Sequence, residues 1–329
     1  MTISDYLQKQ RRIVRQRGVI ATIRSAGLEA VTKGLWPAAR QLETPIWAGE
    51  WDICLVLDGC RVDTWRRIAP EYGFENGQTA VSVGSASMEW LAETFGARYR
   101  TQWSAAGYVT ANPFSGERGG ESRFLRSSAS PLAEHGLVYL DEVWRDQWQP
   151  RELPTVPPDI LTGRGLYAWQ QRDRLGVDRL VVHYMQPHTP FRSRTEWTAG
   201  WALDGFSTGD GRGKDDWAKV RDGEIEREAF LEAYRDNLRW VLGEVQRWAR
   251  TVDATILVTS DHGNALGEWG EWGHPAGSAN PVLRRVPWCQ VDACGEGVES
   301  LSVPGSPPVV AGGTDVEEQL AALGYLGDD

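Results

Sequence analysis

Lysine, cysteine and histidine are all scarce in this chain of 329 residues. The net charge is −10, and only four of the 35 basic residues are lysines, namely Lys9, Lys33, Lys214 and Lys219. Binding to nucleic acid depends on neutralising many phosphates with basic side chains. Because this acidic chain has no basic stripe beyond its first 40 residues, we expect no nucleic-acid partner.

The spacing of the cysteines and the length of the apolar runs exclude two further classes of protein. The cysteines form no C-x-x-C pair, which excludes a zinc ribbon, and no stretch of about 18 apolar residues could span a bilayer. The N-terminus also lacks the apolar core of a secretory signal. We therefore expect a cytoplasmic protein with reduced thiols at Cys54, Cys60, Cys289 and Cys294.

Basic charge gathers at the N-terminus, where residues 1–40 hold eight basic side chains and only two acidic ones, Asp5 and Glu29. Apolar and basic residues are mixed there at roughly helical spacing, which would suit peripheral contact with an anionic membrane surface. A solvated helix packed on the domain is the other interpretation. We divide the chain into a basic helical extension at residues 1–45 and a main domain at residues 46–329.

From about Trp47 onward, short β-rich runs alternate with helical stretches, which predicts a mostly parallel sheet. The best helix is about Glu224–Arg250, whose apolar residues recur at spacings of three and four. Residues 192–222 lack sustained periodicity and are expected to form a long loop or lid. The clearest expected strands are Ile53–Leu57, Thr79–Val83, Tyr108–Thr110, Leu180–Tyr184 and Thr255–Thr259.

Four of the five histidines fall in two compact segments, each after an apolar run: His183 and His188 in VVHYMQPHTPF, and His262 and His274 in TSDHGNALGEWGEWGHP. Loops beyond the carboxyl ends of parallel strands assemble sites at one edge of a sheet, so we expect the two segments to converge. In the second segment, Asp261 and His262 offer a carboxylate and an imidazole, which suit Zn²⁺ or Mn²⁺.

Asp58 closes the apolar run of the first expected strand, in WDICLVLDGCRVD. Taken alone, an aspartate at this place is as well explained as a helix N-cap. Together with the histidine segments, a metal-ligand role is favoured.

These motifs resemble the alkaline phosphatase and sulfatase superfamily, whose members often carry S-D-H-G, then G-E and a downstream G-H. This chain has Ser260-Asp261-His262-Gly263, then Gly267-Glu268 and Gly273-His274. The spacing of His183, His188 and Pro190 is similar to H-x-x-x-x-H-x-P in phosphoethanolamine transferases. The C-terminal VEEQLAALGYLGDD also looks like the closing helix of many sulfatase-like proteins.

The resemblance implies a three-layer α/β/α sandwich with a mostly parallel central sheet. It implies one divalent metal ion (Zn²⁺, Mn²⁺ or Ca²⁺) bound by Asp58, Asp261, His262 and a nucleophilic serine. His183, His188 and His274 would contact the ester oxygens or the leaving group. Arg61 and Asp63 continue a pattern like that of the transferases and are expected to form a structural ion pair.

The nucleophile should lie at the start of a helix after the second strand, where free N–H groups favour oxyanions. The sequence there is VSVGSASMEWLAETF, with two candidates, Ser85 and Ser87. Aligning Glu89-Trp90 with the Glu-Phe of lipoteichoic acid synthases selects Ser85, whereas a hydroxyl at the helix start selects Ser87. We lean slightly to Ser85 and expect the other serine to cap the helix.

Neither serine is followed by the P-S-R that directs formylglycine formation in sulfatases, so an unmodified serine and phosphoryl transfer are favoured. The sequence therefore predicts a metal-dependent hydrolase or transferase acting on a phosphate or sulfate ester of a small molecule, glycan or lipid. A binding or scaffold protein that kept the fold and lost the chemistry is the alternative.

Overall fold

A seven-stranded sheet with strand order β2-β9-β6-β1-β5-β3-β4 forms the centre of the molecule. The computed structural model describes residues 34, 40–74, 77–116, 136–148, 153–197, 216–295 and 305. Strand β9 is antiparallel to both its neighbours, and the other paired strands run parallel. The strands are β1 (Ile53–Leu57), β2 (Gln78–Val81), β3 (Ala106–Thr110), β4 (Tyr139–Glu142), β5 (Arg179–Tyr184), β6 (Ile256–Thr259) and β9 (Arg285–Val291).

Strand β1 lies in the middle of this sheet and shows why the sheet is covered on both sides. Its five residues are all buried. Ile53, Leu55 and Leu57 pack into one apolar cluster, while Cys54 and Val56 pack into another. Successive side chains of a strand point to opposite faces, so an unbroken apolar run requires helices on both.

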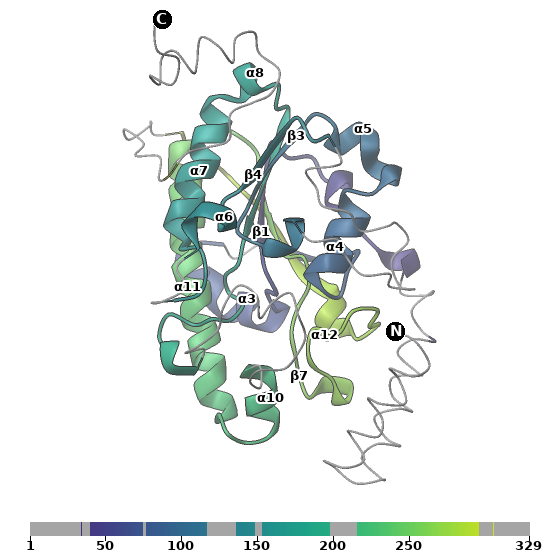
Figure 1. Cartoon of the computed structure of the whole chain (residues 1–329), viewed down its shortest axis with the longest axis vertical. Helices are drawn as coiled ribbons and strands as arrows, with labels where there is room; N and C mark the ends of the chain where they lie inside the picture. Colours follow the sequence, from purple (N-terminus) through teal and green to yellow (C-terminus); the bar gives the residue numbers. More distant parts are fainter. Residues whose placement is uncertain are drawn as a thin grey trace, which may run out of the picture.

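Helices α3 (Val62–Ile68), α7 (Pro158–Gln170) and α11 (Arg227–Thr251) cover one face, and α4 (Ser87–Thr94) and α5 (Arg100–Trp103) cover the other, as Figure 1 shows. The structure therefore confirms the expected α/β/α sandwich. The shorter helices are α6 (Trp144–Gln147), α8 (Arg172–Leu175), α10 (Asp216–Arg221) and α12 (Pro281–Arg284). A small antiparallel pair, β7 (Ala265–Leu266) and β8 (Trp272–Gly273), follows the end of β6.

Short 3-10 helices complete the secondary structure of the described residues. They are η1 (Arg40–Leu42), η2 (Ile46–Ala48), η3 (Ala69–Tyr72), η4 (Ala97–Tyr99), η5 (Pro113–Gly116), η7 (Thr195–Trp197) and η8 (Glu268–Gly270).

Helix α11 matches the helix expected at about Glu224–Arg250 and carries the predicted apolar stripe. Its buried side chains include Phe230, Tyr234, Leu238, Val241 and Val245, which recur every three or four residues along one face. Burial of such a stripe stabilises a long helix more than its intrinsic propensity does.

The five expected strands are all present, with ends that differ by up to two residues. Strands β4 and β9 were not among them. The expected loop or lid at 192–222 contains helix α10 within its described part. Residues 198–215, most of the extension at 1–45 and the C-terminal segment VEEQLAALGYLGDD lie outside the described residues.

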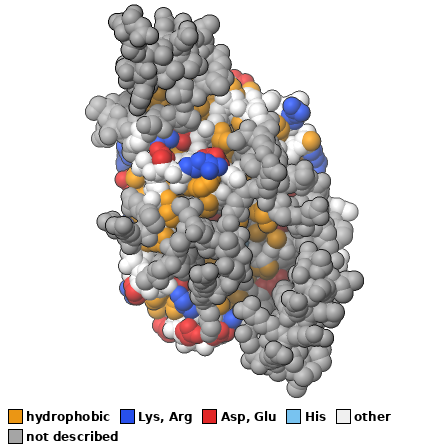
Figure 2. Space-filling view, in the orientation of Figure 1, with side chains coloured by type: hydrophobic (Ala, Val, Ile, Leu, Met, Phe, Trp, Pro, Cys, Tyr) orange, Lys and Arg blue, Asp and Glu red, His pale blue; other side chains and the backbone are white. Residues whose placement is uncertain are grey.

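Acidic and basic side chains are interspersed at the lower end of the face shown in Figure 2. Among the described helices, none combines the length and the apolar character needed to cross a membrane.

Candidate active site

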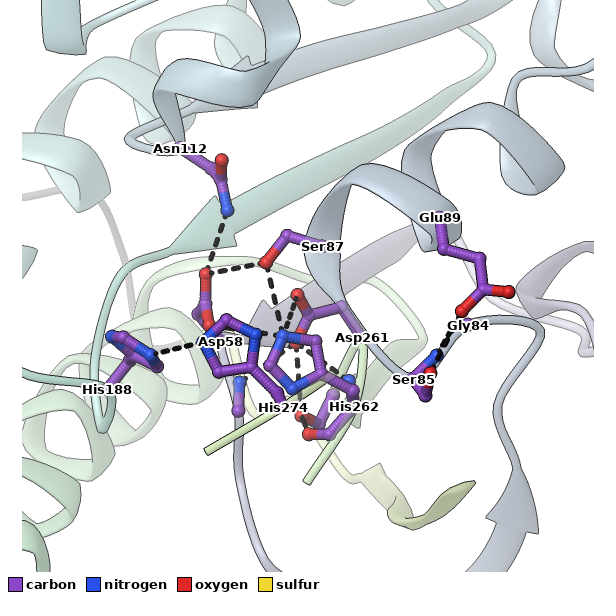
Figure 3. A network of polar contacts seen from close by, with 12 residues as sticks. Asp58, Gly84, Ser85, Ser87, Glu89, Asn112, His188, Asp261, His262 and His274 are labelled. Atoms are coloured by element: carbon purple, nitrogen blue, oxygen red, sulfur yellow. Dashed lines mark hydrogen bonds and ion pairs between the residues drawn. The ribbon is translucent and has the colours of Figure 1, made fainter. Parts of the chain in front are cut away.

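The parallel strands β5, β1 and β6 are neighbours, so their carboxyl ends meet at one edge of the sheet. Asp58 follows β1, His183 lies near the end of β5, and Asp261 and His262 follow β6. All four side chains are buried. The structure thus brings together the segments that the sequence predicted would converge (Figure 3).

Asp261 is oriented by two backbone N–H groups. Its Oδ1 accepts hydrogen bonds from the N–H of Gly59 at 2.9 Å and of His262 at 2.8 Å. Its Oδ2 is buried and has no hydrogen-bond partner among the residues that the structure describes. Because buried polar atoms are nearly always satisfied, this oxygen is available to a ligand.

Gly59 makes this close approach possible. It has a φ of +64°, and a Cβ there would lie 2.3 Å from Nδ2 of Asn264. Only glycine reaches this left-handed conformation without strain, and it also leaves room for the Asn264 amide. That amide donates to the carbonyl of Gly59 at 2.9 Å.

Like Asp261, Asp58 has one carboxylate oxygen that accepts hydrogen bonds and one that is open to a ligand. Its Oδ2 accepts from Asn112 Nδ2 at 2.8 Å and from the hydroxyl of Ser87 at 3.2 Å. Its Oδ1 is buried without a partner. The open oxygen lies 3.7 Å from Nε2 of His262, so it faces the same point as the open oxygen of Asp261.

His262 provides the third candidate metal ligand beside Asp58 and Asp261. Its Nδ1 lies 2.8 Å from the carbonyl oxygen of Gly263, which can only accept, so Nδ1 carries the proton and the Nε2 lone pair is free. Nε2 lies 3.3 Å from Oδ2 of Asp261. Ligand atoms of Asp58, Asp261 and His262 all lie within 4.8 Å of one another.

The electrostatics of the two carboxylates favour a cation. Burial, and then the negative charge of Asp261, raises the pKa of Asp58 well above its usual range. Burial also raises the pKa of Asp261, but the positive charges that His262 and His183 carry when protonated outweigh it and hold this pKa well below its usual range. Two open carboxylate oxygens and one imidazole nitrogen are ligands that divalent ions such as Zn²⁺ accept. The residues present therefore fit the metal ion that the resemblance implied.

The two candidate serines occupy different places (Figure 3). Ser87 is the first residue of α4, and its Oγ lies 3.2 Å from Asp58 Oδ2 and 3.2 Å from His262 Nε2. Ser85 lies beside Glu89, with its Oγ 3.0 Å from Glu89 Oε2 and 2.9 Å from the carbonyl oxygen of Pro275. Ser87 is thus within the metal-ligand cluster, whereas Ser85 joins two loops.

His188 and His274 lie on one side of the cluster, with their Nε2 atoms 3.0 Å apart. Nδ1 of His188 is 2.8 Å from the carbonyl oxygen of Thr189, so neutral His188 accepts at Nε2 and His274 donates. Burial lowers the pKa of His188 to about 4. The ring of His274 stacks on His262, with centroids 4.6 Å apart.

His183 approaches from β5. Its Nδ1 lies 2.8 Å from the hydroxyl of Tyr108, and its Nε2 is buried, without a hydrogen-bond partner, and 3.6 Å from Oδ2 of Asp261. All the histidines that the sequence singled out therefore surround the same cluster.

Sequence reasoning missed Asn112 and Tyr108. Asn112 follows β3, the strand next to β5, and its side chain contacts Asp58 directly. A polar side chain just beyond an expected strand is the same signal that drew attention to Asp58. Arg61 and Asp63 form the expected ion pair, at 2.6 Å.

Comparisons with known proteins give matches to solved structures alone. No protein-family model matches the chain, and neither does any curated protein. The soluble domain of lipooligosaccharide phosphoethanolamine transferase A from Neisseria meningitidis is 13% identical over 77% of this chain and 80% of that one, with a TM-score of 0.43. The C-terminal periplasmic domain of EptC from Escherichia coli, in complex with Zn, is 8% identical over 77% and 76%, with a TM-score of 0.42.

A protein from Bacteroides fragilis, provisionally described as a sulfatase, is 14% identical over 74% of this chain and 67% of that one, with a TM-score of 0.36. Phosphoethanolamine transferases and sulfatases are the enzymes whose motifs the sequence resembles. The structural matches are thus to the same kinds of enzyme that the sequence motifs resemble. At these TM-scores the matches carry no argument about substrate or reaction.

The expectation of a cytoplasmic protein is contradicted by this comparison, because the Escherichia coli match is a periplasmic domain. That expectation depended on the missing apolar signal core near the N-terminus.

Proposed function

We propose that this protein is a metal-dependent hydrolase or transferase that acts on a phosphate or sulfate ester through Ser87. One observation carries the proposal: the Ser87 hydroxyl lies 3.2 Å from both Asp58 and His262, at the point that the unsatisfied ligand atoms face. The hydroxyl is at the first residue of α4, where N–H groups not used within the helix favour an incoming oxyanion.

Asp58, Asp261 and His262 would hold one divalent ion, with Ser87 as a further ligand. Such an ion lowers the pKa of a nearby hydroxyl and neutralises part of the charge of an incoming anion. The protein orients these ligands itself. The N–H groups of Gly59 and His262 fix Asp261, and Asn112 fixes Asp58, before any substrate arrives.

In the first step Ser87 Oγ forms a bond to phosphorus or sulfur, and the bond to the ester oxygen on the opposite side breaks. Asp58 Oδ2, which already accepts a hydrogen bond from the hydroxyl, is placed to hold the proton that Ser87 gives up. The product is a covalent phosphoserine or sulfoserine. Water, or a hydroxyl of a sugar or lipid, then accepts the group and releases Ser87.

We assign the three histidines to the oxygens of the ester. His183, His188 and His274 would stabilise the non-bridging oxygens or protonate the leaving oxygen. Of His188 and His274, His274 would be the donor: Nδ1 of His188 is engaged with the carbonyl of Thr189, so the proton between the two rings belongs to His274, and this N–H would exchange His188 for an ester oxygen when substrate binds.

The substrate would be an ester of a small molecule, glycan or lipid. Phosphoryl transfer is favoured over sulfuryl transfer, because Ser87 is followed by Met88 and Glu89 rather than by the residues that direct formylglycine formation.

The test is a screen of metal-loaded protein against aryl phosphate, phosphodiester and sulfate esters, followed by mass spectrometry after an acid quench. We expect turnover of at least one ester and a modified peptide that contains Ser87. A protein that binds no metal and turns over no ester would instead be a binding or scaffold protein.

A further inference from the structure

A cavity lined mainly by charged side chains lies between the start of α3 and the first turns of α11, helices that Figure 1 shows side by side. Its volume is about 230 Å³, and four of its seven lining residues are arginines: Arg61, Arg67, Arg227 and Arg235. Asp63 is the one acidic residue in the lining. None of the residues proposed to bind metal or ester lines this cavity.

The four arginines differ in how far they are buried. Arg61 and Arg235 are buried, with 6% and 8% of their surface exposed, whereas Arg67 and Arg227 are exposed. Arg227, Leu231 and Arg235 are spaced by four residues, which places them on one face of α11. Two helices therefore direct basic side chains into the same space.

The acidic neighbours leave part of this charge unpaired. Arg61 is fully engaged, because its guanidinium donates to Asp63, to Glu268 and to the carbonyl of Asn264. Arg235 is engaged through Nη1 alone, with Glu228 and Glu232 at 2.7 and 2.9 Å.

Nε of Arg235 is buried and, within the described part of the chain, has no hydrogen-bond partner, which is costly for a charged donor. Arg67 and Arg227 form no ion pair with any residue that the structure describes.

We infer that this cavity is a binding site for a phosphate-type oxyanion, distinct from the metal centre. Guanidinium groups pair with oxyanions through charge-assisted hydrogen bonds, and a tetrahedral anion offers acceptors in several directions to donors on two helices. The cavity volume of about 230 Å³ is several times the roughly 30 Å³ that one water occupies in the liquid, which leaves room for a small tetrahedral anion. The anion is either free in solution, as inorganic phosphate or a soluble phosphate monoester, or the headgroup of an acidic lipid.

The inference does not depend on the proposed catalytic reaction, and the experiment separates the two. The full-length protein is titrated with inorganic phosphate by calorimetry, once loaded with Zn²⁺ and once after removal of metal. The variant R67Q/R227Q removes the charges of the two exposed arginines of the cavity. The matched control is R66Q. Arg66 is an exposed arginine of α3, as Arg67 is, but it does not line the cavity.

We expect phosphate binding that weakens with added salt, persists without metal, and falls at least about tenfold in R67Q/R227Q but not in R66Q. Binding that appears only in the metal-loaded protein would assign the anion to the metal centre and overturn the inference. So would equal affinities of wild type and R67Q/R227Q.

A second arm identifies the source of the anion. The same proteins are sedimented with phosphatidylcholine vesicles, with and without phosphatidic acid. Sedimentation that needs phosphatidic acid and is lost in R67Q/R227Q supports the site and assigns it to a lipid headgroup. Phosphate binding in solution without such sedimentation supports the site and assigns it to a soluble anion. The absence of both refutes it.

Discussion

The hydroxyl oxygen of Ser87 lies 3.2 Å from Nε2 of His262, although 175 residues separate the two in the chain. This contact joins the start of α4 to the end of β6. It distinguishes Ser87 from Ser85, which is two residues away and hydrogen-bonds to other groups.

Replacing Ser87 with Ala should abolish the covalent adduct and lower turnover by orders of magnitude, since the hydroxyl proposed to attack is lost and Ser85, the other candidate, hydrogen-bonds to Glu89 and Pro275 instead. The control is Ser85→Ala, which removes hydrogen bonds to buried groups and should lower the melting temperature while the adduct still forms. Acid-quenched mass spectrometry and thermal unfolding report the two effects. An adduct in folded S87A, or its loss in folded S85A, would contradict the assignment.

Replacing Asp261 with Asn should remove most of the bound metal, as measured by elemental analysis. The amide weakens coordination, and one negative charge next to the cation is lost. Asp63→Asn is the matched control, because Asp63 is a largely exposed carboxylate that pairs with Arg61 outside the ligand cluster. Equal metal content in wild type and D261N would refute the proposed metal site.

Replacing Asn112 with Ala should weaken metal binding by about 10-fold to 100-fold, the usual effect of losing a group that orients a metal ligand. Without the 2.8 Å hydrogen bond from Asn112, the carboxylate of Asp58 is free to rotate away. Competition with a chelator measures the affinity, and circular dichroism checks the fold. Unchanged affinity would leave Asn112 with a packing role alone.

Gly59→Ala should both destabilise the protein and lower metal affinity, because the new Cβ meets Asn264 at 2.3 Å beside the N–H that holds Asp261. Gly73→Ala is the control. Gly73 also has a positive φ, of +81°, but nothing lies within 4 Å of the added Cβ. It should cost about 1 kcal/mol from backbone strain and leave metal binding unchanged. Equal effects of the two substitutions on metal affinity would refute the role of Gly59.

Membrane contact through residues 1–40 stays a prediction. Full-length protein should sediment with anionic vesicles and be released as salt rises, and a variant without these residues should not sediment. The experiment should be run with R67Q/R227Q as well, so that binding through the N-terminal segment is separated from binding through the arginine-lined cavity.

The ends of β1 and β6 could be predicted because each of these strands is a short apolar run followed by a polar residue. Asp58, Asp261 and His262 were found in that way. Strand β9 could not, because Pro287 lacks an N–H and argues against an interior strand, yet it pairs with Thr79 of β2.

The choice between the serines could not be predicted either. Ala86 is extended and Ser87 begins the helix, so the directions of both hydroxyls depend on a helix start that sequence alone fixes poorly.

Ser85 has one further consequence for the site. Its hydroxyl contacts the carbonyl of Pro275 and accepts from the N–H of Ser278, so it fastens the segment that carries His274 to the turn before α4. Ser87, the proposed nucleophile, and His274 therefore lie on two segments that the hydrogen bonds of Ser85 hold together. The proposed reaction would therefore require little rearrangement of these two groups relative to each other.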